Sequence, residues 1–279
     1  MTPQDRHFRQ LLEERWSAGK FVCIGLDTDP DKVPEVVVRE PDDPHAFLAF
    51  NKAIIEATGD IAGAFKFNSA FYEAHGVAGL MGLRDSIRTA HRIAPGVPVI
   101  LDAKRADIDN TNSGYVRFAF DIMQADAITV SPYLGRKALK PFLECKNKGI
   151  FVLCRTSNDG AGEFQDLECG GLPLYVHVAR KVATTWNENG NCGVVAGATR
   201  PSELATVRFQ VNDLPILIPG IGAQGGDVEA TVKAGKCSRG RGMLVNSSRG
   251  IIYASSGNDF ANAARLEALR LHELITSFL

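Results

Sequence analysis

The chain has 279 residues, a formal net charge of −1 and an apolar fraction of 45%. This composition is ordinary for a globular protein and excludes a wholly disordered chain, and the near-neutral charge argues against a nucleic-acid-binding protein, which would carry a basic stripe. No stretch approaches the roughly 18 consecutive apolar residues of a membrane span, and acidic residues stand where a signal peptide has its apolar run. We therefore expect a cytoplasmic protein that binds neither nucleic acid nor membrane.

Eight short apolar runs recur along the chain, and their starts lie on average about 32 residues apart, the length of one strand–helix unit. The runs are 21–26, 62–68, 97–104, 127–132, 150–157, 192–198, 215–221 and 243–248. Helical patterns separate them, near 77–94, 110–124, 135–147, 173–189, 201–211, 226–235 and 258–277, besides two nearer the N-terminus. Strands that alternate with helices imply a parallel sheet. Eight strands favour closure over an open, doubly wound sheet with one run miscounted, so we predict a single (β/α)8 TIM barrel spanning residues 1–279 as one domain.

The two N-terminal helices have readable starts. Thr2 is the expected N-cap of the first, with Pro3 at its first helical position and Gly19 as its stop. The second helix is expected to begin at Asp43 and Pro44. An apolar stripe at helical spacing follows each start, so each helix is predicted to pack one face against the barrel.

Two connections are unusually long. Residues 27–43 follow the first strand, and the glycine-rich segment 158–172 follows the fifth. Both leave the carboxyl ends of strands, where barrel enzymes place their sites. A surface insertion is the simpler interpretation of each, but the composition of the second predicts a lid over the site.

Charged residues occupy strand positions where a barrel should be apolar. Side chains alternate between the two faces of a strand, so Asp102 and Lys104 share one face of the third strand, and Lys66 lies opposite two phenylalanines of the second. If the apolar faces pack against helices, four charges project into the mouth of the barrel: Asp27, Lys66, Asp102 and Lys104. A solvated strand end explains any one of them, but together they are costly to bury unless they pair. We predict an alternating row of acids and amines, with Asp107 just beyond it.

The remaining strand ends carry polar groups of other kinds. Thr156 and Ser157 follow the fifth strand and offer hydroxyls suited to a neutral polar heterocycle. The glycine-rich turn 219–227 follows the seventh strand and opens a helix, a shape that presents backbone N–H groups to an anion, and Arg249 follows the eighth. Because barrel phosphate sites favour the loops after strands seven and eight, we expect a phosphate group there.

The cysteines and histidines form no metal-binding pattern. The six cysteines lie at positions 23, 145, 154, 169, 192 and 237, and no two form a CxxC pair. The six histidines form neither HxxxH nor HxH, so the spacing matches no zinc template. We expect free, reduced cysteines and no bound metal.

The segment 101–111, LDAKRADIDNT, resembles the Asp-x-Lys-x-x-Asp-Ile-x-x-Thr signature of the orotidine 5′-phosphate decarboxylase family. Other pieces resemble that family in the same order: 25–30, 65–73, 155–158, 219–227 and Arg249. The length, the insertion after the first strand and the PGIGAQ loop are similar to the longer bacterial and protozoan (type 2) form. Ala106 and Asp109 depart from the pattern, since the family often has glycine at these positions.

The resemblance implies a cytoplasmic carboxy-lyase that needs no cofactor and converts orotidine 5′-phosphate to UMP and CO2, the last step of de novo pyrimidine biosynthesis. By matching position it implies that Lys104 protonates the C6 carbanion beside Asp102, and that Lys66 holds the charge network and contacts ribose. It also implies a homodimer in which Asp107, Ile108 and Thr111 reach into the neighbouring subunit's site. The implied substrate contacts are Asp27 and Asn68 for ribose, Ser157 for the pyrimidine, and Gln224 and Arg249 for the phosphate. We also expect Thr156 to bind the substrate beside Ser157.

Three other functions remain open. A metal-dependent sugar-phosphate lyase or decarboxylase such as hexulose-phosphate synthase would use acids to hold magnesium, a non-catalytic barrel would only sense uridylate or orotidylate, and an aldolase would form a Schiff base on Lys66 or Lys104. The polar step 156–158 and the paired lysines favour the nucleobase interpretation over the first. Flanking acids should keep both amines protonated, which argues against the aldolase.

Overall fold

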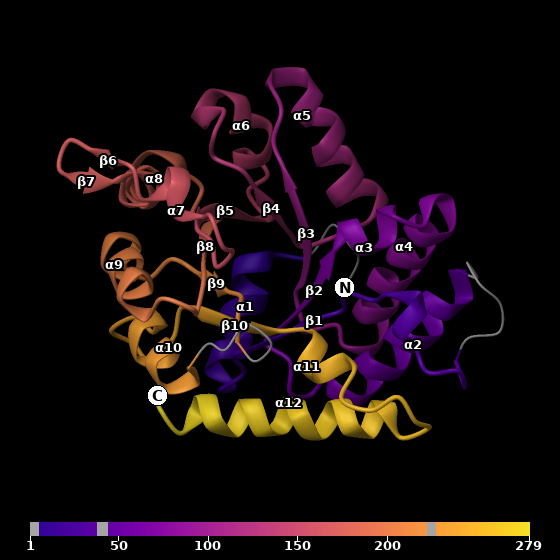
Figure 1. Ribbon diagram of the computed structural model, residues 1–279. Helices are drawn as coiled ribbons and strands as arrows, with labels where there is room; N and C mark the ends of the chain where they lie inside the picture. The colour runs from indigo at the N-terminus through magenta and orange to yellow at the C-terminus, as the bar shows by residue number, and fades with distance from the viewer. Residues whose placement is uncertain (1–5, 38–43, 222–226) are drawn as a thin grey trace.

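The computed structural model describes residues 6–37, 44–221 and 227–279. Parallel strands close into a barrel in the order β1-β10-β9-β8-β5-β4-β3-β2 (Figure 1). They are β1 (Val22–Gly25), β2 (Ala64–Asn68), β3 (Val99–Arg105), β4 (Ala127–Val130), β5 (Gly149–Arg155), β8 (Cys192–Ala196), β9 (Ile216–Ile218) and β10 (Met243–Ser247). Each falls on one of the eight apolar runs, so the predicted (β/α)8 barrel is confirmed.

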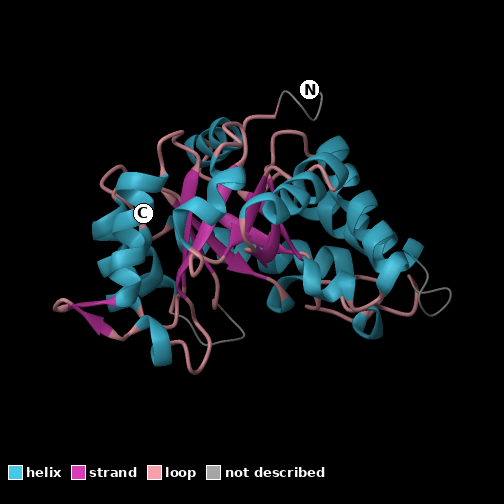
Figure 2. Ribbon diagram, turned by 90° about the horizontal axis from the view of Figure 1, so that it is seen from above, coloured by secondary structure: helices cyan, strands magenta, loops and turns pink. Residues whose placement is uncertain are grey.

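Helices surround the strands, which lie at the centre of the molecule when it is seen from above (Figure 2). In chain order they are α1 (Phe8–Ser17), the short 3-10 helix η2 (Pro30–Lys32), α2 (Pro44–Thr58), α3 (Ser69–Glu73), α4 (Gly76–Ile93), α5 (Asp109–Val116), η3 (Arg117–Ile122), α6 (Gly135–Leu143), α7 (Gly162–Gln165), α8 (Leu174–Lys181), η4 (Val182–Trp186), α9 (Pro201–Val211), α10 (Val228–Gly235), α11 (Arg249–Ile252) and α12 (Phe260–Thr276). The last helix, α12, packs against α2, α10 and α11. None of the helices in the described ranges is long and apolar enough to cross a membrane.

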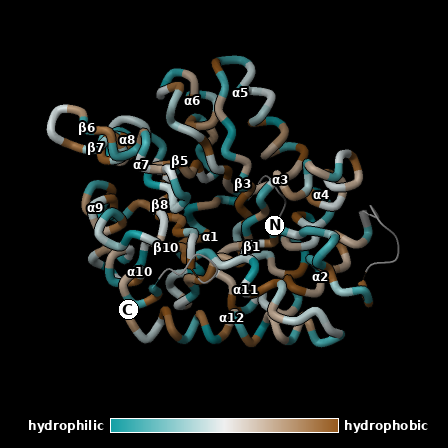
Figure 3. The backbone as a smooth tube through the Cα atoms, viewed as in Figure 1, coloured by the Kyte–Doolittle hydropathy of each residue, from teal (hydrophilic) through white to brown (hydrophobic). Residues whose placement is uncertain are grey.

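The core lies between the strands and the helices. Every residue of β1, β4, β8, β9 and β10 is buried, as expected for parallel strands that are covered on both faces. On β2, the Phe67 ring lies 6.1 Å from the Tyr72 ring of α3, so the apolar face of this strand packs against helices, as predicted. Along α12, apolar and polar positions alternate (Figure 3), which leaves one face for the core and one for water.

The first helix begins later than predicted. It starts at Phe8, after His7, whereas Thr2 and Pro3 lie outside the described residues. Arg6, only 2% exposed, turns instead toward the barrel, where its guanidinium donates to both carboxylate oxygens of Asp126 at 2.8 Å. A buried charge that is paired in this way fixes the backbone before the helix, so α1 begins at Phe8, later than predicted. The predicted start of α2 at Pro44 is confirmed.

The segment 158–172 is more structured than a simple loop. It contains α7, followed by a two-stranded antiparallel hairpin of β6 (Glu168–Cys169) and β7 (Leu172–Pro173). The hairpin turns through Gly170 and Gly171, whose φ angles are +59° and +79°, a region that glycine enters without steric cost. In Figure 1 the hairpin projects away from the barrel beside α8.

Candidate active site

A cavity of about 630 Å³ opens at the carboxyl ends of the strands. Its walls come from the ends of seven strands or the loops that follow them, with Leu153, Val195 and Leu217 as apolar neighbours of the polar groups. The polar and charged lining residues are Asp27, Lys66, Asn68, Asp102, Lys104, Thr156, Ser157, Asn158, Gln165, Asn246, Ser247, Ser248 and Arg249. The site therefore lies at the end of the barrel that the sequence indicated.

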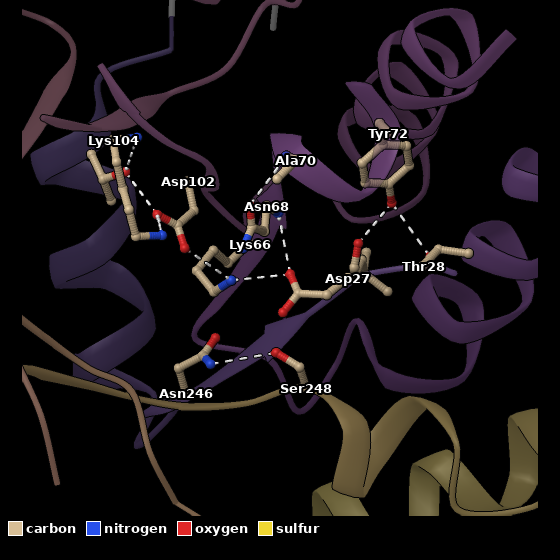
Figure 4. A network of polar contacts seen from close by, with 12 residues as sticks. Asp27, Thr28, Lys66, Asn68, Ala70, Tyr72, Asp102, Lys104, Asn246 and Ser248 are labelled. Carbon is tan, nitrogen blue, oxygen red and sulfur yellow. Dashed lines mark hydrogen bonds and ion pairs between the residues drawn. The ribbon is translucent and has the colours of Figure 1, made fainter. Parts of the chain in front are cut away.

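The four predicted charges form one continuous row (Figure 4). Lys66 Nζ lies 3.1 Å from Asp27 Oδ1 and 3.4 Å from Asp102 Oδ2. Lys104 Nζ donates to Asp102 Oδ1 at 2.8 Å. Lys66 is almost fully buried, with 5% of its side chain exposed, whereas 48% of the Lys104 side chain is exposed toward the cavity. Lys104 is thus the amine that an incoming molecule can reach.

Two members of the row, Lys66 and Asp102, hold their charges at neutral pH. Burial alone would lower the pKa of Lys66, but the carboxylates of Asp27 and Asp102 outweigh it and raise that pKa above its usual range. Burial likewise would raise the pKa of Asp102, but Lys66 and Lys104 hold it below its usual range. A Lys66 amine that stays protonated cannot attack a carbonyl group, which argues against a Schiff base there.

The structure adds Thr129, which the sequence analysis missed. Its hydroxyl donates to Asp102 Oδ1 at 2.8 Å and accepts the Lys104 N–H at 2.9 Å. Lys104 has a φ of +46°, a left-handed conformation that is uncommon for a residue with a side chain. The available signal was a single polar residue in the otherwise apolar strand β4.

The end of β1 is held from outside the barrel. The Tyr72 hydroxyl donates to the carbonyl of Leu26 at 2.7 Å, and the Asn68 N–H donates to Asp27 Oδ1 at 3.2 Å. The Asn68 side chain accepts the Ala70 N–H and so caps α3. These bonds fix Asp27 and Asn68 side by side at the wall of the cavity.

Opposite them, the segment after β5 is clamped by Gln165, a second residue that the sequence analysis missed because it reaches back from α7. Its side-chain oxygen accepts the Thr156 N–H at 2.9 Å and its amide donates to the Thr156 hydroxyl at 2.9 Å. Ser157 packs against Gly197, where an added Cβ would lie 2.6 Å from Ser157 Cβ. The Ser157 hydroxyl makes no hydrogen bond within the described part of the chain, so it is available to a ligand.

The third wall fits the predicted anion site. Gly220, Ser248 and Arg249 line the cavity, and Arg249 makes no ion pair with any residue that the structure describes. Ser248 packs on Gly25, where a Cβ would lie 1.8 Å from its hydroxyl oxygen, so only glycine permits this approach. Gln224, the other predicted phosphate contact, lies outside the described residues.

The three residues implied for a neighbouring subunit do not line this cavity. Asp107 and Ile108 lie in the loop between β3 and α5, and Thr111 lies in α5 itself. Ile108 is 58% exposed. Asp109, the departure noted above, begins α5 with a φ of +38°. The structure therefore places this group on the surface of the chain rather than in its own site.

All six cysteines are free. Within the described ranges, no group of three or more histidine, cysteine, aspartate or glutamate side chains is arranged to hold a metal ion.

The comparison with known proteins extends over nearly the whole chain. A model of the orotidine 5′-phosphate decarboxylase / HUMPS family matches residues 20–265. The chain is 47% identical over 274 residues to an orotidine 5′-phosphate decarboxylase of Azoarcus sp., covering 98% of this chain and 99% of that protein. It superposes on a Leishmania donovani OMP decarboxylase with a TM-score of 0.83 and 38% identity, covering 97% and 99% of the two chains. With Leishmania donovani UMP synthase the TM-score is 0.87 and the identity 40%, over 98% of this chain and 56% of that one.

Proposed function

The chain belongs to the orotidine 5′-phosphate decarboxylase / HUMPS family and converts orotidine 5′-phosphate to UMP and CO2 in pyrimidine biosynthesis, and from this premise we propose that the cavity is its active site, on one catalytic domain of residues 1–279. The row of Asp27, Lys66, Asp102 and Lys104, with contacts of 2.8 to 3.4 Å, carries the proposal. It is a fixed arrangement of charge built before any substrate arrives.

Lys104 is the proton donor in this proposal. When the bond between C6 and the carboxyl carbon breaks, CO2 leaves and the electron pair stays on a vinylic carbon that has no electron sink. A positioned ammonium stabilises that negative charge and then transfers its proton from Nζ to C6. Asp102 lies against the substrate carboxylate, and its repulsion is relieved as neutral CO2 departs.

The other walls of the cavity receive the rest of the substrate. Asp27 and Asn68 bind the ribose hydroxyls together with Lys66. Ser157, whose hydroxyl has no hydrogen-bond partner among the described residues, binds the pyrimidine, with Thr156 beside it. Arg249 and Gln224 bind the phosphate, which is remote from the bond that breaks, so its binding energy is available to close the segment 158–172 over the substrate.

A second copy of the chain completes the site. Ile108, Tyr133 and Leu134 are 58%, 87% and 45% exposed on loops that follow the neighbouring strands β3 and β4, and exposed apolar surface of this kind marks an interaction site. In a symmetric dimer that packs there, Asp107, Ile108 and Thr111 reach the partner subunit's cavity. Mixing inactive Lys104→Ala and Asp107→Ala chains tests this, because random exchange should restore about a quarter of wild-type activity. Mixtures that stay inactive although the chains exchange would exclude shared sites.

The function itself is tested by following the loss of orotidine 5′-phosphate absorbance with EDTA present. The wild type is expected to turn over undiminished by the chelator, and Lys104→Ala is expected to lose turnover but still bind UMP. Lys52→Ala is a matched control, because Lys52 is a lysine of α2 with the same 48% side-chain exposure. Chelator-sensitive turnover of a sugar phosphate would support the metal-dependent lyase instead, and a wild type that binds nucleotide without turnover would support the sensor.

A further inference from the structure

Thr129 lies where the pairing of β3 with β4 breaks. Leu101 pairs with Ile128, but the next pair is Arg105 with Val130. Residues 102–104 of β3 therefore lie opposite Thr129 alone. A bulge of this kind leaves backbone groups without partners in the strand ladder and redirects the side chains it carries. Two of the residues in this bulge are Asp102 and Lys104.

The Thr129 side chain supplies hydrogen bonds at the point where the pairing of β3 with β4 is interrupted. A hydroxyl has one proton to donate and lone pairs to accept, and here both are used at once: Oγ1 accepts the Lys104 N–H at 2.9 Å and donates to Asp102 Oδ1 at 2.8 Å. Thr129 is 1% exposed, so water does not offer an alternative partner. The same carboxylate oxygen of Asp102 also receives Lys104 Nζ at 2.8 Å.

These bonds hold three groups in a fixed relation: the Lys104 backbone, the Asp102 carboxylate and the Lys104 amine. Lys104 reaches back to a residue only two positions earlier, and it does so from a left-handed backbone with a φ of +46°. Such a conformation costs free energy and persists only where neighbouring groups hold it. The Thr129 hydroxyl holds the backbone at its N–H and holds the carboxylate that orients the amine.

We propose that Thr129 is a positioning residue for the decarboxylation, whose hydroxyl fixes both the Asp102 carboxylate and the backbone from which Lys104 reaches C6. This inference rests on the proposed role of Lys104 as proton donor. Burial would raise the pKa of Asp102, but the two lysines hold it low, and the hydrogen bond from Thr129 adds to their effect.

The test replaces the hydroxyl and keeps the shape. Thr129→Val is expected to lower kcat by about 10- to 100-fold, the range for one hydrogen bond to a charged group. The Kd for UMP should change by less than about threefold, because UMP carries no carboxylate at C6. Thr129→Ser keeps the hydroxyl and is expected to stay within about threefold of wild-type kcat. If the valine variant does not fold, Thr129→Ala against Thr129→Ser gives the same comparison.

A buried threonine elsewhere separates positioning from stability. Thr58 in α2 donates its hydroxyl to the Ile54 carbonyl at 2.6 Å, so Thr58→Val should lower the melting temperature without changing kcat. A Thr129→Val kcat within twofold of wild type would overturn the inference, and so would a serine variant as impaired as the valine variant. Because loss of turnover in Lys104→Ala tests the proposed function separately, a normal Thr129→Val beside an inactive Lys104→Ala would refute the role of Thr129 alone.

Discussion

Replacing Lys66 by methionine tests whether the charge row stabilises the fold, because this ammonium contacts both Asp27 and Asp102. Its removal changes the formal charge of the row from neutral to one net negative charge. That charge is buried, because only 5% of the Lys66 side chain is exposed. Breaking a buried ion pair by removing one partner costs about 3–5 kcal/mol, since the remaining charge stays buried without compensation. We expect the free energy of unfolding at pH 7 to fall by about that amount and turnover to be lost.

The loss should depend on pH with a definite sign. Without Lys66, Asp27 and Asp102 face each other, so the folded-state pKa of one of them rises above its unfolded value. A raised carboxyl pKa means that the folded variant takes up a proton as the pH falls, and this uptake favours folding. The wild type changes little between pH 7 and pH 5, because the pKa of Asp102 is held low and such a group costs stability only below the unfolded carboxyl pKa of about 4. The difference between the two proteins should therefore shrink from about pH 7 to about pH 5.

Urea unfolding at several pH values measures this difference. Lys52→Met, an exposed lysine paired at 3.7 Å with Glu56, is the control and should stay within about 0.5 kcal/mol of wild type. Adding Asp27→Asn to Lys66→Met removes the uncompensated charge and should recover part of the loss. A deficit below about 1 kcal/mol that does not change with pH would refute the reasoning.

Three further outcomes follow from the geometry. Gly197→Ala places a Cβ 2.6 Å from Ser157 Cβ and should weaken UMP binding by about tenfold or more, as overpacking displaces Ser157, the proposed pyrimidine contact. Gly96→Ala, which meets open space, should leave the Kd unchanged. Arg249→Ala should raise KM by about 10- to 100-fold through loss of a charged hydrogen bond to phosphate; an unchanged KM would place the phosphate elsewhere. Arg6→Met leaves a buried carboxylate unpaired and should lower the unfolding free energy by about 3–5 kcal/mol in urea titrations while KM stays the same.

The barrel and the charge row could be predicted from the sequence for a physical reason. Parallel strands covered on both faces produce continuous apolar runs, and a charge within such a run is conspicuous because it must face either the helices or the barrel mouth. Lys66 between Phe65 and Phe67 is the clearest example. The twofold alternation of a strand then decided which face it occupies, and the structure confirms that choice.

The features that sequence reasoning missed depend on tertiary geometry. Thr129 acts because the ladder between β3 and β4 shifts register, and a bulge leaves no fixed pattern in the sequence of either strand. Gln165 acts through a short helix that folds back nine positions to Thr156. Arg6 stays outside α1 because it pairs with Asp126. That partner lies 120 positions away along the chain, so no local capping pattern reveals the contact.

Proton exchange at C6 of UMP tests the role of Lys104 most directly. A group that protonates the C6 carbanion must, by reversal of the same step, also remove the C6 proton of bound UMP, so the wild-type protein in deuterium oxide should place deuterium at C6, visible by NMR. Lys104→Ala should bind UMP and give no exchange above the protein-free rate. Equal exchange in the two proteins would contradict the assignment of Lys104 as the proton donor.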